Sequence, residues 1–274
     1  MEEIKNMEKI KNWEEFEKKL ISEEKQRTEN FKNEVKKRGH RLSVTDPLFR
    51  GQADEMWSLS TTLERFYQER GQNLQEFSTK EYFGILKKIN HGVSSNYGLP
   101  EKCEDKGMGA PAGYDLMAHL RHHRFPSPLL DWTVSPYIAA YFAFRDPNIT
   151  NDAAIYVFRE TVGQGKISDG EMSPNIWVPG PYVCTHPRHH KQQAQYTVCR
   201  KQGDSGDWVY CSHENNFDNA QNVLKQYIIP KAERQKFLAN LDQMNINDYS
   251  LFGDKYSLMN TLAYREIEKF FESC

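Results

Sequence analysis

The sequence predicts an α+β fold, with helices near both ends and a strand-rich middle. Two observations predict it. Helical patterns lie near both ends of the chain, with dense Glu/Lys alternation in residues 1–38, and short β-branched and aromatic runs recur between 153 and 229. The chain has 274 residues and shows no linker, internal repeat or low-complexity tract, so we expect a single domain over residues 1–274.

The first predicted helix covers residues 12–38, within an N-terminal helical extension at 1–40. Asn12 suits the capping position, Glu15 completes a capping box, and Gly39 is a typical helix stop. Because its apolar stripe is sparse, we expect this helix on the surface of the domain. Its Glu/Lys side either faces solvent or contacts a partner.

Shorter elements follow the extension. A strand at 48–50 precedes predicted helices at 62–70, 76–91 and 114–121. The Gly-, Pro- and Lys-rich segment 92–113 separates the last two of these helices. It is the longest turn-rich stretch of the chain, and we expect a mobile loop there.

The segment SPLLDWTVSPYIAAYFAFRD predicts a strand, a polar turn and a helix that begins at Pro136 with Ser135 as its cap. Residues 153–160 form a strong strand pattern. Pro230 then opens a helix that ends near Gln243. The other predicted elements are strands at 176–184, 194–200, 207–212 and 222–229, and a last helix at 255–272.

Composition narrows the function classes. The chain has 36 Lys and Arg against 38 Asp and Glu, so any contact with nucleic acid must come from a local basic patch. No signal-peptide core or membrane span is visible, and the five cysteines lack the spacing of a disulfide framework. We therefore expect a reduced, cytoplasmic protein without a membrane partner.

Short catalytic and nucleotide-binding motifs such as the Walker loop, GxGxxG, HExxH and GxSxG are absent. One residue separates Cys184 from His186, and one separates Cys211 from His213. On a strand each pair would share a face, which leaves a zinc interpretation open. Structural zinc sites more often use C-x(2–4)-C pairs, so we expect no metal.

Arg50 is the first candidate for a ligand contact. It lies between Phe49, an apolar anchor, and Gly51, which leaves the backbone open to close approach. A guanidinium group suits bidentate recognition of phosphate or carboxylate. A structural ion pair is the alternative, and residue type alone favours neither.

A second group of candidates surrounds the predicted strand end Asp131-Trp132-Thr133. His122 and His123 precede it, across a proline-containing turn. Polar groups at strand ends often form ligand sites, because a rigid scaffold holds the loops there. Asp131 could equally cap the turn or bind a neighbouring arginine, and Trp132 could equally belong to the core.

Two basic segments, RHHR (121–124) and HPRHHKQQAQYT (186–197), are candidates for contact with nucleic acid. A solvated loop is the alternative for the second segment. The residues proposed for this contact are Arg121, His123, Arg124, Arg188, His189, His190, Lys191 and Tyr196.

Together these segments resemble the FRG domain family over about residues 10–272. The aromatic-Arg-Gly motif of that family matches Phe49-Arg50-Gly51, which Gln52, WSL (57–59) and Arg65 follow. The central motif matches PSPLLDWT (126–133) and the helix YIAAYFAF. Later elements match Arg188 with two glutamines and the INDYSLF turn (246–252). The chain departs from the family pattern by Arg121 in place of Gln, Arg124 in place of Gly and Pro128 in place of Arg.

The resemblance implies an ADP-ribosyltransferase-like fold: a split, mixed or antiparallel sheet with N-terminal and C-terminal helices. It also implies NAD as the substrate and a toxin role in a bacterial toxin–antitoxin system that acts against phage. The basic segments favour RNA as the acceptor of ADP-ribose, with DNA or protein as other acceptors and an antitoxin as a partner. NAD hydrolysis and non-catalytic binding of a nucleotide or partner are the alternatives.

The resemblance also distributes roles among the candidate residues. Either Gln193 or Gln195 falls where a catalytic Glu is usual in this fold. The catalytic candidates are Arg50, His122, Asp131 and Gln193. The cofactor-binding candidates are Phe49, Gly51, Gln52, Ser60, Arg65, Trp132, Thr133 and Tyr141.

Overall fold

The computed structural model describes residues 7–37, 43–72, 77–97, 110–162, 174–180, 183, 185–214, 216–217 and 222–268. The strands are β1 (Met7–Lys9), β2 (Ser43–Val44), β3 (Leu48–Gln52), β4 (Leu129–Thr133), β5 (Ala153–Val162), β6 (Asn175–Trp177), β7 (Ala194–Gln202), β8 (Trp208–Tyr210) and β9 (Asn222–Ile229). They form one sheet in the order β1-β9-β5-β3-β4-β7-β6, with β2 paired to β5 and β8 paired to β7. The β1–β9 ladder is parallel and the others are antiparallel, so the sheet is mixed.

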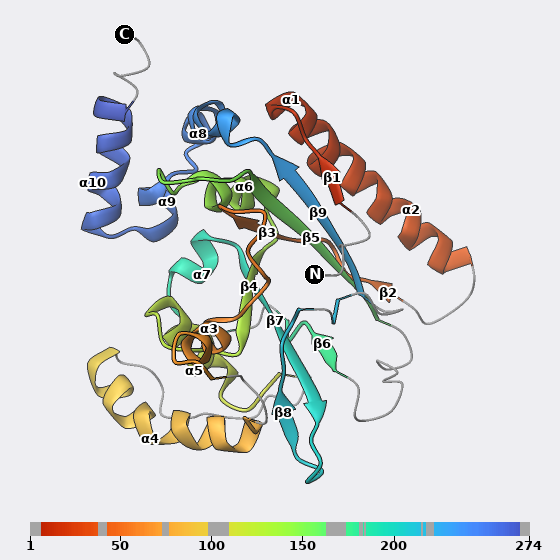
Figure 1. The fold of residues 1–274 in the computed structure, drawn as a ribbon, viewed down its shortest axis with the longest axis vertical. Helices are drawn as coiled ribbons and strands as arrows, with labels where there is room; N and C mark the ends of the chain where they lie inside the picture. The colour runs from red at the N-terminus through yellow and green to blue at the C-terminus, as the bar shows by residue number, and fades with distance from the viewer. Residues whose placement is uncertain are drawn as a thin grey trace.

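Helices flank this sheet (Figure 1). The α-helices are α1 (Trp13–Phe16), α2 (Glu24–Lys37), α3 (Thr62–Gln68), α4 (Thr79–Tyr97), α5 (Tyr114–His122), α6 (Pro136–Phe144), α7 (Arg188–Lys191), α8 (Arg234–Gln243), α9 (Asp248–Phe252) and α10 (Lys255–Ala263). The other helical turns are η1 (Glu17–Glu23), η2 (Lys231–Glu233) and η3 (Tyr264–Glu268).

Two helical groups cover the same face of the sheet, because residues that pair in an antiparallel ladder point to one side. Over β3, β5 and β9, buried side chains such as Phe49 and Ile155 pack against α1, α6 and α8. Over β4 and β7, Leu129 and Tyr196 pack against α4 and α5. A third cluster, which includes Trp132, fills the opposite face.

The sheet divides between β3 and β4, at the boundary of the two helical groups. β3 pairs with β5 along its whole length, and β4 pairs with β7 along its whole length. Between β3 and β4 the register contains only Phe49 opposite Thr133. Beyond this pair the two strands diverge and form a fork. A mixed sheet with helices near both ends of the chain is thus confirmed, and its assignment to the ADP-ribosyltransferase fold stays a prediction.

The N-terminal helical segment is more deeply embedded than its sparse apolar stripe predicts. Trp13, Phe16 and Leu20 are buried in the cluster that includes α6 and α8. Glu24 is 1% exposed, forms an ion pair with Arg159, and accepts a 2.6 Å hydrogen bond from the Tyr227 hydroxyl. Only the remaining charged side of the helix lies on the surface.

Other differences from the sequence predictions are local. The helix predicted at 76–91 continues to Tyr97, so 92–97 is helical rather than loop, and residues 98–109 of the predicted mobile loop lie outside the described residues. Of the strand predicted at 176–184, residues 176 and 177 lie in β6, residues 178–180 and 183 are not in a strand, and residues 181, 182 and 184 lie outside the described part of the chain. β1, β2, α7 and α9 were not predicted. Among the described helices, none combines the length and apolar character needed to cross a membrane.

We predict that Glu24→Gln lowers the free energy of unfolding by about 3–5 kcal/mol, because it leaves the guanidinium of Arg159 without its buried carboxylate partner. Denaturant unfolding followed by circular dichroism measures this loss. Glu29→Gln on the exposed side of α2 is the matched control and should change stability by less than about 0.5 kcal/mol. Equal effects of the two variants would contradict this account of how α2 is held.

Candidate functional site

Arg50 occupies the fork between β3 and β4. Its Nη1 donates a 2.9 Å hydrogen bond to the main-chain carbonyl of Asp131, and its Nε donates a 3.2 Å bond to Oε1 of Gln52. The Asp131 carbonyl faces the separated strand β3, so the side chain of Arg50 replaces a partner that a continuous ladder would provide. Burial lowers the pKa of Arg50 to about 10, against the opposing effect of Asp131, and the group stays cationic at neutral pH.

Three arginines gather around one carboxylate at this fork. Arg121, from α5, forms an ion pair with the carboxylate of Asp131. Arg65, from α3, donates a 2.6 Å hydrogen bond to the carbonyl of Ser60. Burial lowers the pKa of Arg65, and the charge of Arg121 lowers it further. Three cations against one anion give the fork a net positive charge, which favours an anionic ligand.

Local hydrogen bonds fix the segment that connects β3 to α3. Nε2 of the buried Gln52 donates a 2.9 Å bond to the carbonyl of Trp57. Thr61 and Glu64 form a capping box at the start of α3. The Thr62 hydroxyl accepts a 3.0 Å bond from the amide of Ser127, just before β4. Arg65 is therefore held beside β4 although it lies far from that strand in the sequence.

Gly51 brings α6 into direct contact with β3. A Cβ atom at this position would lie 1.8 Å from the main-chain oxygen of Ala139 and 2.7 Å from the amide nitrogen of Ala143. Both of these atoms belong to the backbone of α6, which cannot move as a single side chain can. The glycine of the aromatic-Arg-Gly motif is thus required for close packing and presents no side chain to a ligand.

His122 ends α5 on the other side of the fork. Its Nε2 lies 3.1 Å from the hydroxyl of Tyr196, and that hydroxyl lies 3.4 Å from Nδ1 of His189. Burial lowers the pKa of His122 to about 4, although the carboxylate of Asp131 acts in the opposite direction. The imidazole is therefore neutral at physiological pH and is suited to hydrogen bonding.

Trp132 belongs to the core behind the fork. The indole Nε1 donates a 2.9 Å bond to Oγ1 of Thr197, which lies 3.1 Å from Nε2 of the buried His213. Burial lowers the pKa of His213 to about 3, and the positive charge of Arg50 contributes. The neighbouring Thr133 is also buried and donates a 2.8 Å bond to the carbonyl of Gln192.

The fork opens into a cleft of about 1720 Å³. Residues of α3 and α5 line one side, and residues of α6, α8 and α10 line the other. The cleft has two parts, which we name by their lining. The arginine lobe contains Arg50, Arg65, Arg121 and Asp131, and the aromatic lobe contains Tyr141, Phe142, Arg145, Asp248, Phe252, Tyr256 and Asn260.

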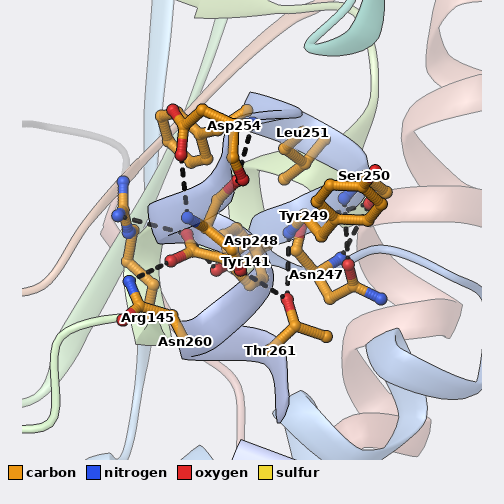
Figure 2. Close-up of polar contacts among 12 residues, drawn as sticks. Tyr141, Arg145, Asn247, Asp248, Tyr249, Ser250, Leu251, Asp254, Asn260 and Thr261 are labelled. Atoms are coloured by element: carbon orange, nitrogen blue, oxygen red, sulfur yellow. Dashed lines mark hydrogen bonds and ion pairs between the residues drawn. The ribbon is translucent and has the colours of Figure 1, made fainter. Parts of the chain in front are cut away.

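Asp248 organises the aromatic lobe (Figure 2). Its carboxylate accepts hydrogen bonds from the Tyr141 hydroxyl at 2.7 Å and from Nδ2 of Asn260 at 2.7 Å, and it forms a 3.2 Å ion pair with Arg145. The guanidinium of Arg145 also lies over the Phe252 ring, 4.5 Å from its centroid. Of these residues, the sequence reasoning identified only Tyr141; the sole further signal was the resemblance of the INDYSLF turn.

The structure brings most of the predicted site residues to one cleft. Those that line it are Phe49, Arg50, Gly51, Gln52, Ser60, Arg65, Arg121, His122, Arg124, Asp131, Trp132, Thr133, Tyr141 and Arg188. Not all of these side chains are accessible from the cleft. Those of Phe49, Trp132 and Thr133 are buried.

The structure does not bring Gln193 to the cleft. This residue is exposed, has a φ of 46° and ends the turn before β7, whereas its neighbour Gln192 lines the cleft. Gln195 pairs with Trp132 in the ladder, so its side chain points to the opposite face of the sheet from Asp131. Neither glutamine lies where we expected a replacement for a catalytic Glu.

The predicted nucleic-acid contacts also separate into groups. His189 and Tyr196 are buried and bond to each other, so neither is a surface contact. Arg188 lines the cleft but forms a 2.7 Å ion pair with Asp254 and donates to the carbonyl of His122. The exposed members of the set are His123, Arg124, His190 and Lys191.

In the described part of the chain, no group of three or more His, Cys, Asp or Glu residues is placed so that it could hold a metal ion. Cys184 lies outside that part. His213 bonds to Thr197, and the sulfur of Cys211 lies 3.0 Å from that of Cys199.

Comparison with known families identifies a match that covers part of the chain. Residues 45–152 match the FRG domain, a span that runs from the segment before β3 to the start of β5 and includes Arg50, His122 and Asp131. The search of curated proteins and the search of solved structures found no match.

We predict that Gly51→Ala destabilises the protein by about 2–3 kcal/mol, because the new methyl group overlaps the backbone of α6. The control is Gly84→Ala in α4, where a Cβ meets no atom within 4 Å and the higher helix propensity of Ala should add up to about 1 kcal/mol. Thermal and denaturant unfolding measure both. A neutral Gly51→Ala would show that α6 does not press on β3.

We predict that the imidazole of His122 stays unprotonated down to about pH 4, because burial depresses its pKa. The unfolded chain protonates this ring near pH 6.5, so the stability that His122 contributes is present above that pH and is lost as the pH falls toward 4. NMR titration of the ring signal, assigned with His122→Gln, measures the pKa. A midpoint near 6.5 would contradict the buried environment.

Proposed function

Because this chain carries an FRG domain over residues 45–152, we propose that its cleft binds NAD and that the protein transfers ADP-ribose to a macromolecular acceptor, preferably RNA. The observation that carries the proposal is the gathering of Arg50, Arg65 and Arg121 around Asp131 at the fork of the sheet. The resemblance to the family extends the proposal to a toxin of a bacterial toxin–antitoxin system.

The arginine lobe suits the diphosphate of NAD. Its three guanidinium groups present planar sets of donors. The carboxylate of Asp131 opposes their charge at the fork, and Glu64 and Glu69 of the α3 region also act on Arg65. A drug-sized ligand occupies a pocket of roughly 300–1,000 Å³. The cleft of about 1720 Å³ is larger, so it has room for a dinucleotide together with part of an acceptor.

The aromatic lobe suits a base of the dinucleotide or of the acceptor. The Tyr256 ring is 76% exposed and Phe252 is partly exposed, so both offer surface for stacking. Stacking of a base on an aromatic ring contributes roughly 1–3 kcal/mol and tolerates different bases. Arg145, held by Asp248 beside Phe252, adds a cation at the same place.

The reaction breaks the bond between the nicotinamide nitrogen and C1′ of the ribose, and positive charge develops on the ribose. Asp131 lines the cleft with a side chain that is 38% exposed, and its carboxylate stabilises that charge. The acceptor then bonds to C1′ and loses a proton to the carboxylate of Asp131 or to the neutral imidazole of His122, because both line the cleft and Gln193 does not. Water in the acceptor position gives the alternative reaction, hydrolysis of NAD.

RNA is the preferred acceptor because exposed basic side chains flank the cleft on an otherwise neutral chain. Arg124 lines the cleft and is exposed, and His190 and Lys191 are exposed on the short helix α7. We do not expect Arg188, Tyr196 or His189 to contact RNA, because Arg188 is paired with Asp254 and the other two are buried. An antitoxin would contact surfaces away from the core, such as the charged side of α2.

Incubation of the protein with NAD labelled in the adenosine part, and with separate pools of RNA, DNA and protein, tests the proposal. Label on RNA that is lost in Asp131→Asn supports it. Label on protein alone contradicts the choice of RNA, and release of nicotinamide without a labelled macromolecule favours hydrolysis. Binding of NAD without turnover favours a non-catalytic module, and absence of binding contradicts the proposal as a whole.

We predict that Arg65→Ala weakens binding of NAD by about 10- to 100-fold, the loss expected for a charge-assisted hydrogen bond of about 1.5–3 kcal/mol. The only protein bonds that Arg65 makes through its guanidinium in the described residues are to nearby Ser60, so the fold should survive. Arg70→Ala is the matched control, because Arg70 bonds to Phe66 at the exposed end of α3 and does not line the cleft. Calorimetric titration measures the affinity of both variants for NAD. If Arg65→Ala and Arg70→Ala bind NAD equally well, the diphosphate does not contact Arg65.

A further inference from the structure

Cys199 and Cys211 face each other where β7 and β8 meet. The register pairs Arg200 with Tyr210, and the amide of Cys211 continues the ladder with a 3.1 Å hydrogen bond to the carbonyl of Cys199. In a hydrogen-bonded antiparallel pair the two Cα atoms lie about 5.5 Å apart. That separation is close to the one most common in disulfides.

The two sulfur atoms already point at each other. Their separation is 3.0 Å, about 1 Å longer than a disulfide bond of ~2.05 Å. Cys199 is buried, whereas Cys211 is partly exposed. A small oxidant from solvent can therefore reach one sulfur, and the second sulfur lies directly behind it.

We propose that Cys199 and Cys211 form a reversible disulfide across the β7–β8 hairpin. A low-molecular-weight disulfide such as glutathione disulfide is the oxidant. The thiolate of Cys211 attacks it, forms a mixed disulfide and releases one small thiol. The thiol of Cys199 then loses its proton and attacks the sulfur of Cys211. The S–S bond of the mixed disulfide breaks, and the second small thiol leaves with the electron pair of that bond and takes up a proton. The protein loses two hydrogens, and one small disulfide becomes two thiols.

The bond would brace the back of the candidate site. Cys199 is two residues from Thr197, which accepts the hydrogen bond of Trp132, and Cys211 is two residues from His213, which contacts the same Thr197. Cys199 and Trp132 also share one buried cluster. Oxidation thus ties the segment that carries His213 to the strand that carries Thr197. These two segments pack behind β4, on the face of the sheet opposite the side chain of Asp131, and the disulfide would link them covalently.

The reversible character follows from the exposure of Cys211. A disulfide that solvent thiols can reach is reduced more readily than a fully buried one. In a reducing compartment such bonds are generally transient and respond to changes in redox state. The Cys199–Cys211 pair would therefore respond to the redox state of its surroundings. The structural change that oxidation produces is the covalent link between β7 and the segment that carries His213.

The experiment uses the full chain with Cys103, Cys184 and Cys274 replaced by Ser, so that only the proposed pair remains. After equilibration with glutathione disulfide, we expect titratable thiols to fall from two to none, the mass to decrease by two hydrogens, and dithiothreitol to reverse both changes. The bond closes a loop between residues 12 positions apart, so the Tm should rise by roughly 5–10 °C. In the wild-type chain, peptide mapping should find Cys199 linked to Cys211.

Cys199→Ser and Cys211→Ser, each in the same background, are the matched controls. Cys199→Ser should accumulate a glutathione adduct on Cys211 with no rise in Tm. Cys211→Ser should react slowly with glutathione disulfide, because the remaining thiol, that of Cys199, is buried. Two thiols that stay titratable in folded protein, or a stable glutathione adduct on Cys211 while Cys199 is present, overturn the proposal. If the triple-Ser protein does not fold, the wild-type map decides, and a linkage other than Cys199–Cys211 overturns it. None of these measurements uses NAD, so their outcome is independent of the proposed function.

Discussion

The hydrogen bond from Arg50 to the main-chain carbonyl of Asp131 is the interaction on which the cleft depends. β3 and β4 separate after a single residue pair, and a carbonyl that loses its ladder partner at such a separation needs another donor. A side chain supplies it, so the two strands stay at the distance that one guanidinium spans. That guanidinium has five N–H donors, and its bonds to Asp131 and Gln52 occupy two of them. The same group therefore holds the fork open and offers donors to the space it creates.

The charges at the fork favour ligand binding at some cost to the unliganded fold. Burial lowers the pKa of Arg50 and of Arg65, and the charge of Arg121 lowers both further. Asp131 compensates only one unit of this positive charge. An anion that binds here relieves the repulsion and so stabilises the folded state by linkage. The residues that hold the fork thus also give it the charge that favours an anionic ligand.

Local signals explain which parts of the structure could be predicted from sequence. Ser135 with Pro136 marks the start of α6, and Arg50, His122 and Asp131, which the sequence motifs single out, all line one cleft in the structure. Long-range partners carry no such signal. The link of Glu24 to Tyr227 joins residues 203 positions apart and turns a helix predicted for the surface into part of the core.

A positive-φ turn explains why the glutamines were misplaced. Gln193 adopts φ 46° just before β7 begins at Ala194, so a shift of one residue separates the cleft-lining Gln192 from the exposed Gln193. Periodicity of two fixes the faces only from the first residue of the strand onward. The burial of Tyr196 then follows from its pairing with Asp131 on the face that packs against α4 and α5.

The motif of Arg188 followed by two glutamines, which spans α7 and the turn before β7, has a structural role. The guanidinium of Arg188 bonds to Asp254 at the start of α10 and to the carbonyl of His122 at the end of α5, and Nε2 of Gln192 donates to the carbonyl of Leu251 in α9. These bonds join the arginine lobe to the aromatic lobe, which different parts of the chain supply. The motif therefore sets the relative position of the two lobes. A ligand that spans both lobes depends on that position, although neither side chain needs to contact it.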